Sequence, residues 1–237
     1  MQLDGDDPDA EGNELDRLAR DGQPAIDNAL QRQLQAVTAN LDPDRLNNVE
    51  RLIPTDADDL REALEILLRE SAGRGVRVTL EKLGQVAIGV NWQLANEAAR
   101  TWAQQYSYEL VSRLNENSRR MLQETVSRWI GSGAPLDDLI ASVSAIFGPV
   151  RGEMIAVTEA TRAYAEGSFT TYEQAGFNRR PPEADRPPAH VRCRCWVSLA
   201  ETDRGVWEYI WLTAQDERVC EICGPKHLTS IGFAGRR

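Results

Sequence analysis

Histidine and cysteine are scarce in this chain of 237 residues, and both histidines and all four cysteines lie between residues 190 and 227. No apolar run approaches the roughly 20 residues that a helix needs to cross a bilayer, which predicts a soluble protein. No signal peptide with a long apolar segment opens the sequence, so an oxidising compartment with stable disulfides is not expected. The absence of a His-Glu-x-x-His or similar pattern argues against a zinc-dependent hydrolase.

Positive charge is scarce at the start of the sequence. Residues 1–70 hold 18 of the 37 acidic side chains but only 7 of the 27 basic ones, and the net charge of −10 therefore belongs to this third. Because DNA phosphates repel such a segment, we do not expect it to lie on DNA. Residues 1–22 are rich in Asp, Glu and Gly, which predicts an acidic arm that is disordered or weakly helical.

Helical periodicity dominates residues 23–176 and predicts a multi-helix body. The expected helices cover residues 24–41, 56–70, 80–130, 135–147 and 150–174. Thr55 and Asp56 are N-cap candidates for the second helix, and Gly73 and Gly75 are expected to end it. The segment 80–130 fits either one very long helix or two helices joined near Tyr106.

The composition changes after Gly176, where arginine, proline and β-branched residues become frequent. Strands are expected at 196–199 and 206–213. Residues 177–237 are too few to bury a core of their own, so a metal would have to hold them together. The predicted fold class is therefore mainly α, with a multi-helix body and a small C-terminal zinc-stapled α+β lobe that begins near residue 177.

The C-terminal segment contains two groups of metal-binding residue types, His-x-x-Cys-x-Cys and Cys-x-x-Cys. Cys220 and Cys223 have the spacing at which two thiolates from a tight turn reach one ion, and four such donors form a closed structural Zn²⁺ site. We expect His190 and one of Cys193 and Cys195 to complete it. Cys195 is preferred because it leads directly into a strand. The predicted cofactor is structural Zn²⁺.

Other interpretations of these residues remain open. The cysteines could be ordinary buried residues, disulfide partners, or a redox pair, although no βαβ pattern surrounds the Cys-x-x-Cys. His227 is a reserve ligand that is more commonly solvated so near a terminus. Glu221 is in the right place for the general base of a catalytic zinc, but a solvated loop carboxylate is the simpler interpretation. No catalytic residue is predicted.

Three blocks of this sequence resemble one known family. They are residues 155–164 (IAVTEATRAY), 187–195 (PPAHVRCRC) and 211–224 (WLTAQDERVCEICG). Together they resemble the phage Mu protein F-like family of minor head proteins, also called head morphogenesis proteins, and the resemblance covers approximately residues 80–227. Two features differ from the family: Val157 stands where an arginine is usual, and the Cys-x-x-Cys block follows the other cysteine block instead of preceding it.

The resemblance implies a minor capsid protein of a tailed phage or prophage that acts structurally in head assembly near the portal. It would reside in the virion, in the capsid interior or at the portal vertex, and in the host cytoplasm during assembly. Its partners would be portal and capsid proteins, with no membrane and no small-molecule substrate. The alternative is a zinc-containing DNA-binding module used in packaging or ejection. DNA contact is not favoured, because acidic residues interleave with the arginines of residues 179–218.

The Thr-Glu helix signature of the family corresponds to Thr158 and Glu159. On a helix, Glu159 can pair with Arg162 at a spacing of three residues. One interpretation is that these residues form a polar contact that locks the helix to the zinc lobe, with Arg218 as the partner on the lobe. The other is a surface ion pair that contributes roughly a few tenths of a kcal/mol.

Overall fold

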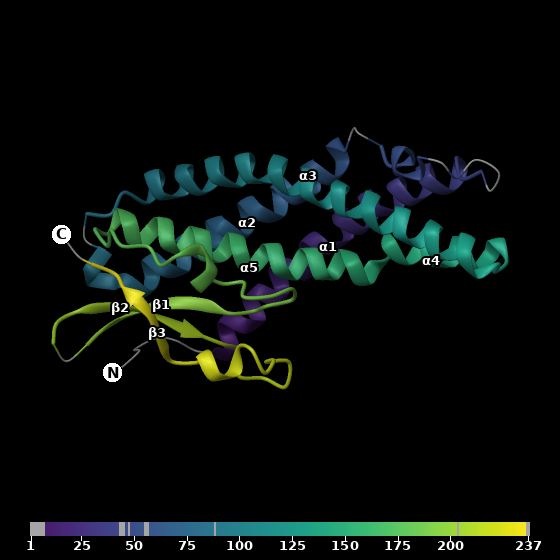
Figure 1. Cartoon of the computed structure of the whole chain (residues 1–237). Coiled ribbons are helices and arrows are strands. Elements are labelled where there is room, and N and C mark those ends of the chain that lie inside the picture. The colour runs from purple at the N-terminus through teal and green to yellow at the C-terminus, as the bar shows by residue number, and fades with distance from the viewer. Residues whose placement is uncertain are drawn as a thin grey trace.

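A computed structural model describes residues 8–42, 46, 48–54, 57–87, 89–202 and 204–235, and it confirms the mainly helical fold class. The long helices are α1 (Pro8–Ala39), α2 (Asp58–Leu83), α3 (Trp92–Ser132) and α5 (Pro149–Gln174), with the shorter α4 (Leu136–Ile146) between the last two. They form an elongated bundle, and a small sheet lies against one end of it (Figure 1). The short 3₁₀ turns are η1 (Val49–Leu52), η2 (Gly84–Ala87), η3 (Glu183–Asp185) and η4 (Gly224–Lys226).

Helix α5 is the central element of the bundle. It packs against α1, α2 and α3, and residues along its whole length are buried. Pro149 occupies its first turn, where the missing N–H costs nothing because no carbonyl is available to it. Gly75 of α2 and Gly167 of α5 lie where these two helices meet, and the absence of side chains there lets the two backbones approach closely.

The acidic start of the sequence is part of the bundle. Helix α1 begins at Pro8, and Leu15 and Leu18 are buried in the main core, so the expected disordered arm is wrong for residues 8–22. Its carboxylates meet cations of α2, as in the ion pair of Glu14 with Arg74 (2.7 Å), which offsets the charge that suggested disorder. Residues 1–7 lie outside the described part of the protein.

Helices α2 and α3 differ from their predicted limits. α2 continues to Leu83 instead of ending at Gly73, because Gly75 serves helix packing there and not chain reversal. α3 is one unbroken helix, and it begins at Trp92 after an Asn91 cap whose side chain accepts hydrogen bonds from two backbone N–H groups. Thr55 and Asp56 lie outside the described residues, so their capping role stays a prediction.

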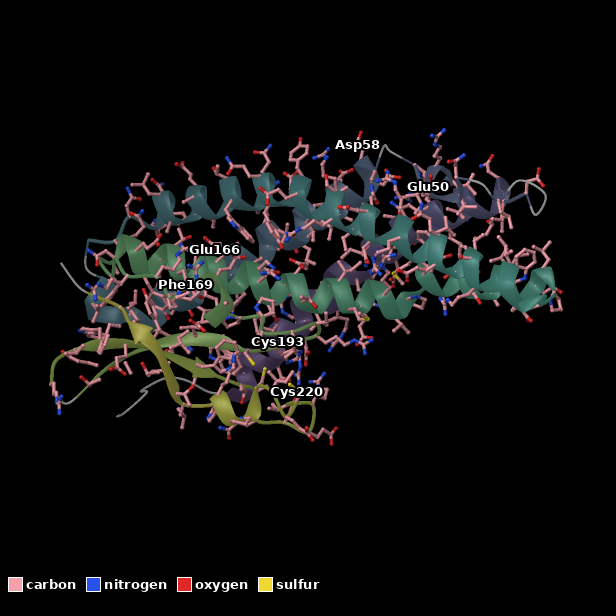
Figure 2. The ribbon with its side chains drawn as sticks, viewed as in Figure 1. Glu50, Asp58, Glu166, Phe169, Cys193 and Cys220 are labelled. Atoms are coloured by element: carbon pink, nitrogen blue, oxygen red, sulfur yellow. The ribbon has the colours of Figure 1, made fainter. Side chains whose placement is uncertain are left out.

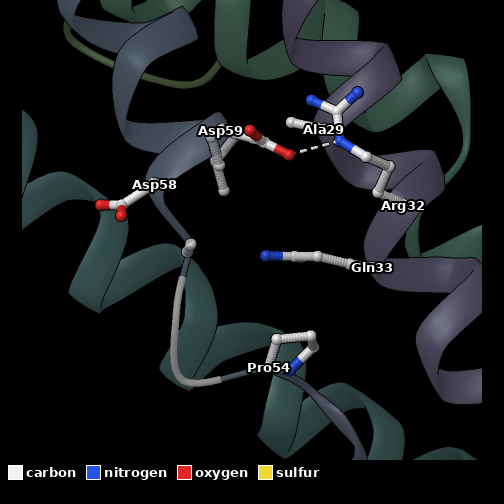
Figure 3. A pocket seen from close by; sticks show the side chains of 8 residues that line it. Ala29, Arg32, Gln33, Pro54, Asp58 and Asp59 are labelled. Atoms are coloured by element: carbon white, nitrogen blue, oxygen red, sulfur yellow. Dashed lines mark ion pairs between the residues drawn. The ribbon is translucent and has the colours of Figure 1, made fainter.

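The start of α2 meets α1 at a cavity of about 250 Å³ (Figure 3). Arg32 of α1 pairs there with Asp59 of α2 at 2.5 Å, the interaction that the dashed line marks. Gln33, on the same side of α1, donates a hydrogen bond of 3.0 Å to the side chain of Asn115 on α3. These contacts hold the second end of the bundle, far along α1 from the sheet.

The segment Leu136–Gln174 is long and apolar enough, by length and composition only, to cross a membrane, which the sequence pattern did not indicate. The backbone turns at Phe147 and Gly148, and this turn divides the segment into α4 and α5. Buried apolar residues of both helices belong to the main core.

The sheet is antiparallel, with the order β1 (Trp196–Glu201), β2 (Trp207–Leu212) and β3 (Thr229–Phe233). Trp196 is opposite Leu212 and Glu201 is opposite Trp207, so β1 and β2 form a hairpin. The first two strands confirm the prediction, whereas β3 was not predicted. It is short, contains a glycine and is only partly buried, so its sequence lacks the alternation of a half-buried strand.

The sheet shares its core with the helices. Trp196, Ile210 and Leu212 belong to the same buried cluster as the helices, and Tyr209 packs with Phe169 of α5 (ring centroids 5.4 Å apart). The change to strand structure after α5 matches the expected boundary near residue 177, but apolar contacts continue across it. Residues 177–237 are therefore supported by the bundle, and their treatment as a separate domain stays a prediction.

Candidate metal centre

The two cysteine-containing segments lie next to each other at the end of the sheet. Residues 190–195 lead into β1, and residues 220–223 follow β2 and precede η4. Cys193 and Cys220, one from each segment, are labelled in Figure 2, where they lie close together beneath the bundle. Antiparallel pairing of β1 and β2 brings the start of β1 next to the end of β2, so the hairpin itself unites segments that are far apart in sequence.

All five predicted donors converge. His190 Nε2 lies 2.9 Å from the Cys220 sulfur and 3.1 Å from the Cys223 sulfur. Cys193 Sγ is 3.8 Å from Cys223 Sγ, and Cys195 completes a second triplet with these two. Cys223 is thus the donor common to both triplets. The group could hold a metal ion, as the spacing predicted.

The distances fit a metal better than a disulfide. With Zn–S bonds of about 2.3 Å, two tetrahedral thiolate ligands lie about 3.8 Å apart, the separation of Cys193 and Cys223. None of the four cysteines forms a disulfide. The donors line a cavity of about 20 Å³, which is large enough for a single ion or water molecule. The imidazole would have to move back by about 0.5 Å to bind the same ion as its two neighbouring sulfurs.

Hydrogen bonding and burial give the thiols different pKa values. Hydrogen bonding from Cys195 lowers the pKa of Cys193 to about 5. Burial raises the pKa of Cys223 to about 12, and the pKa of Cys195 rises because its proton is shared with Cys193 and because it is buried. A cation would reverse these increases by favouring thiolates, since the metal ligand is the deprotonated sulfur.

Helix α5 positions the first cysteine segment through two threonines. Thr158 Oγ1 accepts a hydrogen bond from the backbone N–H of Arg192 at 2.9 Å, and Thr161 Oγ1 donates one to the carbonyl oxygen of Cys193 at 2.6 Å. Thr158 therefore contacts the C-terminal lobe, in agreement with one of the two interpretations of the Thr-Glu signature. Sequence reasoning missed Thr161, although it lies one helical turn after Thr158 and so on the same face.

Within the described part of the protein, Glu159 and Arg162 form their hydrogen bonds and ion pair inside the helical bundle and not with the cysteine segments. Glu159 pairs with Arg162 at 3.1 Å and accepts a hydrogen bond from the hydroxyl of Tyr106 on α3. Burial raises the pKa of Glu159. These residues therefore tie α5 to α3, because they lie on a different face of α5 from Thr158 and Thr161.

Arg218 connects the lobe to α1 instead of α5. Its guanidinium contacts Asp16 at 2.5 Å and Asp216 at 3.1 Å, and the buried Arg194 pairs with the same two carboxylates at 3.2 and 2.6 Å. Two arginines and two aspartates thus bridge the cysteine segments and the first helix. Hydrogen bonding from Arg194 lowers the pKa of Asp216 to about 2. Nothing local in the sequence indicates Asp16 as a partner, because it lies 178 residues before Arg194.

His227 and Glu221 are not part of the cluster. His227 Nδ1 accepts a hydrogen bond from the backbone N–H of Thr213 at 3.2 Å, and its other ring nitrogen contacts Gln215. Glu221 is exposed on the turn between the two cysteines. Neither residue belongs to a described group of donors close enough to hold one ion.

Comparison with protein-family models, with curated proteins and with solved structures finds no match for this protein.

Proposed function

We propose that this protein is a minor capsid protein of a tailed phage or prophage and acts structurally in head assembly near the portal. The proposal rests on the resemblance to phage Mu protein F-like head proteins. One observation supports it above the others: the block at residues 187–195 contacts both of the other blocks that carry the resemblance, through Thr158 with Arg192, Thr161 with Cys193, and Cys193 with Cys223. Sequence motifs that contact one another in the folded protein support a family resemblance better than motifs that lie far apart.

The exchanged order of the cysteine blocks is compatible with this function. The hairpin of β1 and β2 places the two segments side by side, whichever comes first in the sequence. A metal site depends on where its donors meet in space, so the exchange does not prevent the site from forming.

We propose further that the cluster binds one structural Zn²⁺. Thiolates and imidazole are the donors that Zn²⁺ prefers, and four of the five available donors would close its tetrahedral shell. Bound there, the ion would hold the 190–195 and 220–223 segments together. A cavity of about 20 Å³ has no room for a substrate beside the ion, which supports a structural and non-enzymatic role.

Elemental analysis of protein purified without added zinc tests the metal. We expect one zinc per protein molecule, and thiols that react with a thiol reagent only after chelation. Folded protein that purifies without metal, and whose four thiols react rapidly before any chelation, would refute the proposal.

The alternative of a DNA-binding module receives less support from the charges. Arg192, Arg194 and Arg218 each pair with carboxylates of the same protein, which leaves fewer free cations for phosphates. Binding to a DNA duplex at increasing salt concentrations separates the two functions. We expect almost no binding at physiological salt, and tight binding with a steep salt dependence would instead favour the DNA-binding module.

The structural role itself is testable by assembly. The protein would be co-expressed with the capsid, scaffolding and portal proteins of the phage or prophage that encodes it, and the particles separated on a density gradient. We expect it to sediment with the particles only when the portal protein is present. If particles form without incorporating it, or incorporate it equally without the portal protein, the proposed role near the portal is wrong.

A further inference from the structure

A second feature of the molecule is a cleft of about 340 Å³ between α3, the middle of α5 and the loop 180–187. It shares no lining residue with the cavity of the cysteine cluster. Glu166 and Phe169, labelled in Figure 2, mark its α5 wall. Trp102 and Tyr106 form the opposite wall, with stacked rings 4.9 Å apart. This volume is within the range of sites that bind small ligands or short peptide segments.

Four arginines line the cleft, and two of them are paired with carboxylates. Arg162 pairs with Glu159 at 3.1 Å. Arg180 pairs with Glu166 at 2.6 Å and with Glu173 at 2.8 Å. These two guanidiniums are therefore already neutralised by the protein.

The other two arginines, Arg113 and Arg186, form no ion pair within the described part of the protein. Arg186 donates a hydrogen bond of 2.6 Å to the carbonyl oxygen of Pro181 and lies 5.5 Å from the centre of the Phe169 ring. Arg113 lies 5.2 Å from the centre of the Tyr106 ring. Burial, together with the charge of a neighbouring arginine, lowers the pKa of Arg186. A guanidinium over an aromatic ring keeps N–H groups at its edge for an oxyanion.

We propose that this cleft binds a peptide segment of a partner protein through one carboxylate, held by Arg113 and Arg186, next to a large apolar side chain that packs on Trp102. The carboxylate belongs to an acidic side chain or to the C-terminus of the partner, which present the same two oxygens. The site goes beyond the proposed structural function and does not depend on the metal.

The charges of the cleft favour a peptide over a nucleic acid. Glu109 and Glu183 also line it, so its walls carry both signs. The repeated phosphates of a nucleic acid would meet these carboxylates. A peptide instead offers a single carboxylate to the arginines and backbone N–H groups to the glutamates, which is complementary to both.

Titration followed by NMR tests the proposal on the full-length protein. The first probe is a short peptide, blocked at both ends, with one glutamate between two phenylalanines. The second replaces this glutamate by glutamine, the third has no acidic side chain but ends in phenylalanine with a free carboxylate, and the fourth is a short oligothymidylate. The signal is the indole N–H of Trp102, assigned through Trp102→Phe.

We expect saturable shifts with the first or the third peptide, and the comparison identifies the source of the carboxylate. The glutamine peptide should bind far more weakly than the first. Arg186→Gln and the exposed Arg113→Gln should each weaken binding about 10- to 100-fold, as expected for loss of a charge-assisted hydrogen bond. Arg100→Gln, an exposed arginine of α3 that does not line the cleft, should bind normally.

Several results would overturn the proposal. They are the absence of a saturable shift with every peptide, saturable binding of the glutamate and glutamine peptides with equal affinity, or normal binding by both cleft variants. A shift of Trp102 with oligothymidylate alone would assign the cleft to nucleic acid instead. Thermal unfolding of each variant identifies a loss of fold, and the exposed Arg113→Gln provides the test if Arg186→Gln does not fold.

Discussion

Helices α2 and α5 approach each other so closely that a single added methyl group should force them apart. A Cβ atom at Gly75 would lie 2.1 Å from the carbonyl oxygen of Tyr164, and one at Gly167 would lie 2.0 Å from the carbonyl oxygen of Ala72. Ordinary contact begins at 3.4 Å. Because the opposing atoms belong to helical backbone and cannot rotate away, the helices must separate by about 1 Å in a core that is packed as densely as a crystal.

The energetic cost follows from two opposing effects. Overpacking a core costs about 1–3 kcal/mol, and backbone atoms place these sites near the upper end of that range. Alanine favours a helix over glycine by about 1 kcal/mol. We therefore expect Gly75→Ala and Gly167→Ala each to lower the free energy of unfolding by about 1–3 kcal/mol. In a protein of this size, this corresponds to a fall in Tm of roughly 3–10 °C.

The measurement is urea and thermal unfolding followed by circular dichroism. Gly131→Ala is the matched control, since this glycine is also helical but a Cβ there meets nothing within 4 Å. It should raise stability by up to about 1 kcal/mol. The double variant should cost less than the sum of the two single ones, because one separation of the helices accommodates both methyl groups. If Gly75→Ala and Gly167→Ala behave like Gly131→Ala, the inferred close contact of α2 and α5 is wrong.

Three further predictions concern the proposed metal centre, the carboxylates that pair with Arg194, and the contact of α5 with α3. Cys223→Ser should lose its bound metal by elemental analysis, because Cys223 belongs to both donor triplets, and retention of the metal would contradict this assignment. The pKa of Asp216 is lowered from 3.8 to about 2 mainly by Arg194, so its contribution is present above pH 4 and is lost as the pH falls towards 2. Discounted for partial exposure, this contribution is about 1–2 kcal/mol, and Asp216→Asn should remove it at pH 7 and flatten the acid limb of urea-unfolding stability between pH 4 and 2. If the loss of stability between pH 4 and 2 is unchanged in this variant, Asp216 does not contribute to it. Glu159→Ala should cost about 1–3 kcal/mol in the same assay, because Arg162 and the Tyr106 hydroxyl both lose their hydrogen-bond acceptor. Glu159→Gln keeps an acceptor oxygen for them and should cost less than about 1 kcal/mol, and equal costs would refute this hydrogen-bonded contact.

Local pattern accounts for most of the helices. The spacing of apolar residues predicted the body, and the turn residues Pro135, Gly148 and Pro149 marked the limits of α4 and α5. The failures have a non-local cause. Glycine commonly ends a helix, so Gly75 was expected to end α2. The helix continues through it because α5 packs so closely there that no side chain would fit. The acidic residues before Gly22 suggested disorder, because their basic partners lie in other segments of the protein.

For the cysteines and His190 as well, the sequence predicted what depends on nearby residues and missed what depends on distant ones. Their identity and spacing were sufficient to predict a group of metal-binding donors, since a tight turn brings two nearby thiols together regardless of the rest of the fold. The spacing of Thr161 from Thr158, one helical turn, was an available signal, whereas nothing local in the sequence indicated that Arg218 would meet Asp16 of α1 instead of Glu159 of α5.

By itself, the sequence determined where the helices run and which side chains supply metal-binding atoms, because both depend on residues a few positions apart. The tertiary structure alone decided which threonines and aspartates support the donors and which arginines remain unpaired in the cleft. Those pairings depend on how distant helices and strands pack against one another. Packing of that kind is a property of the whole folded protein, and it cannot be predicted from the spacing of nearby residues.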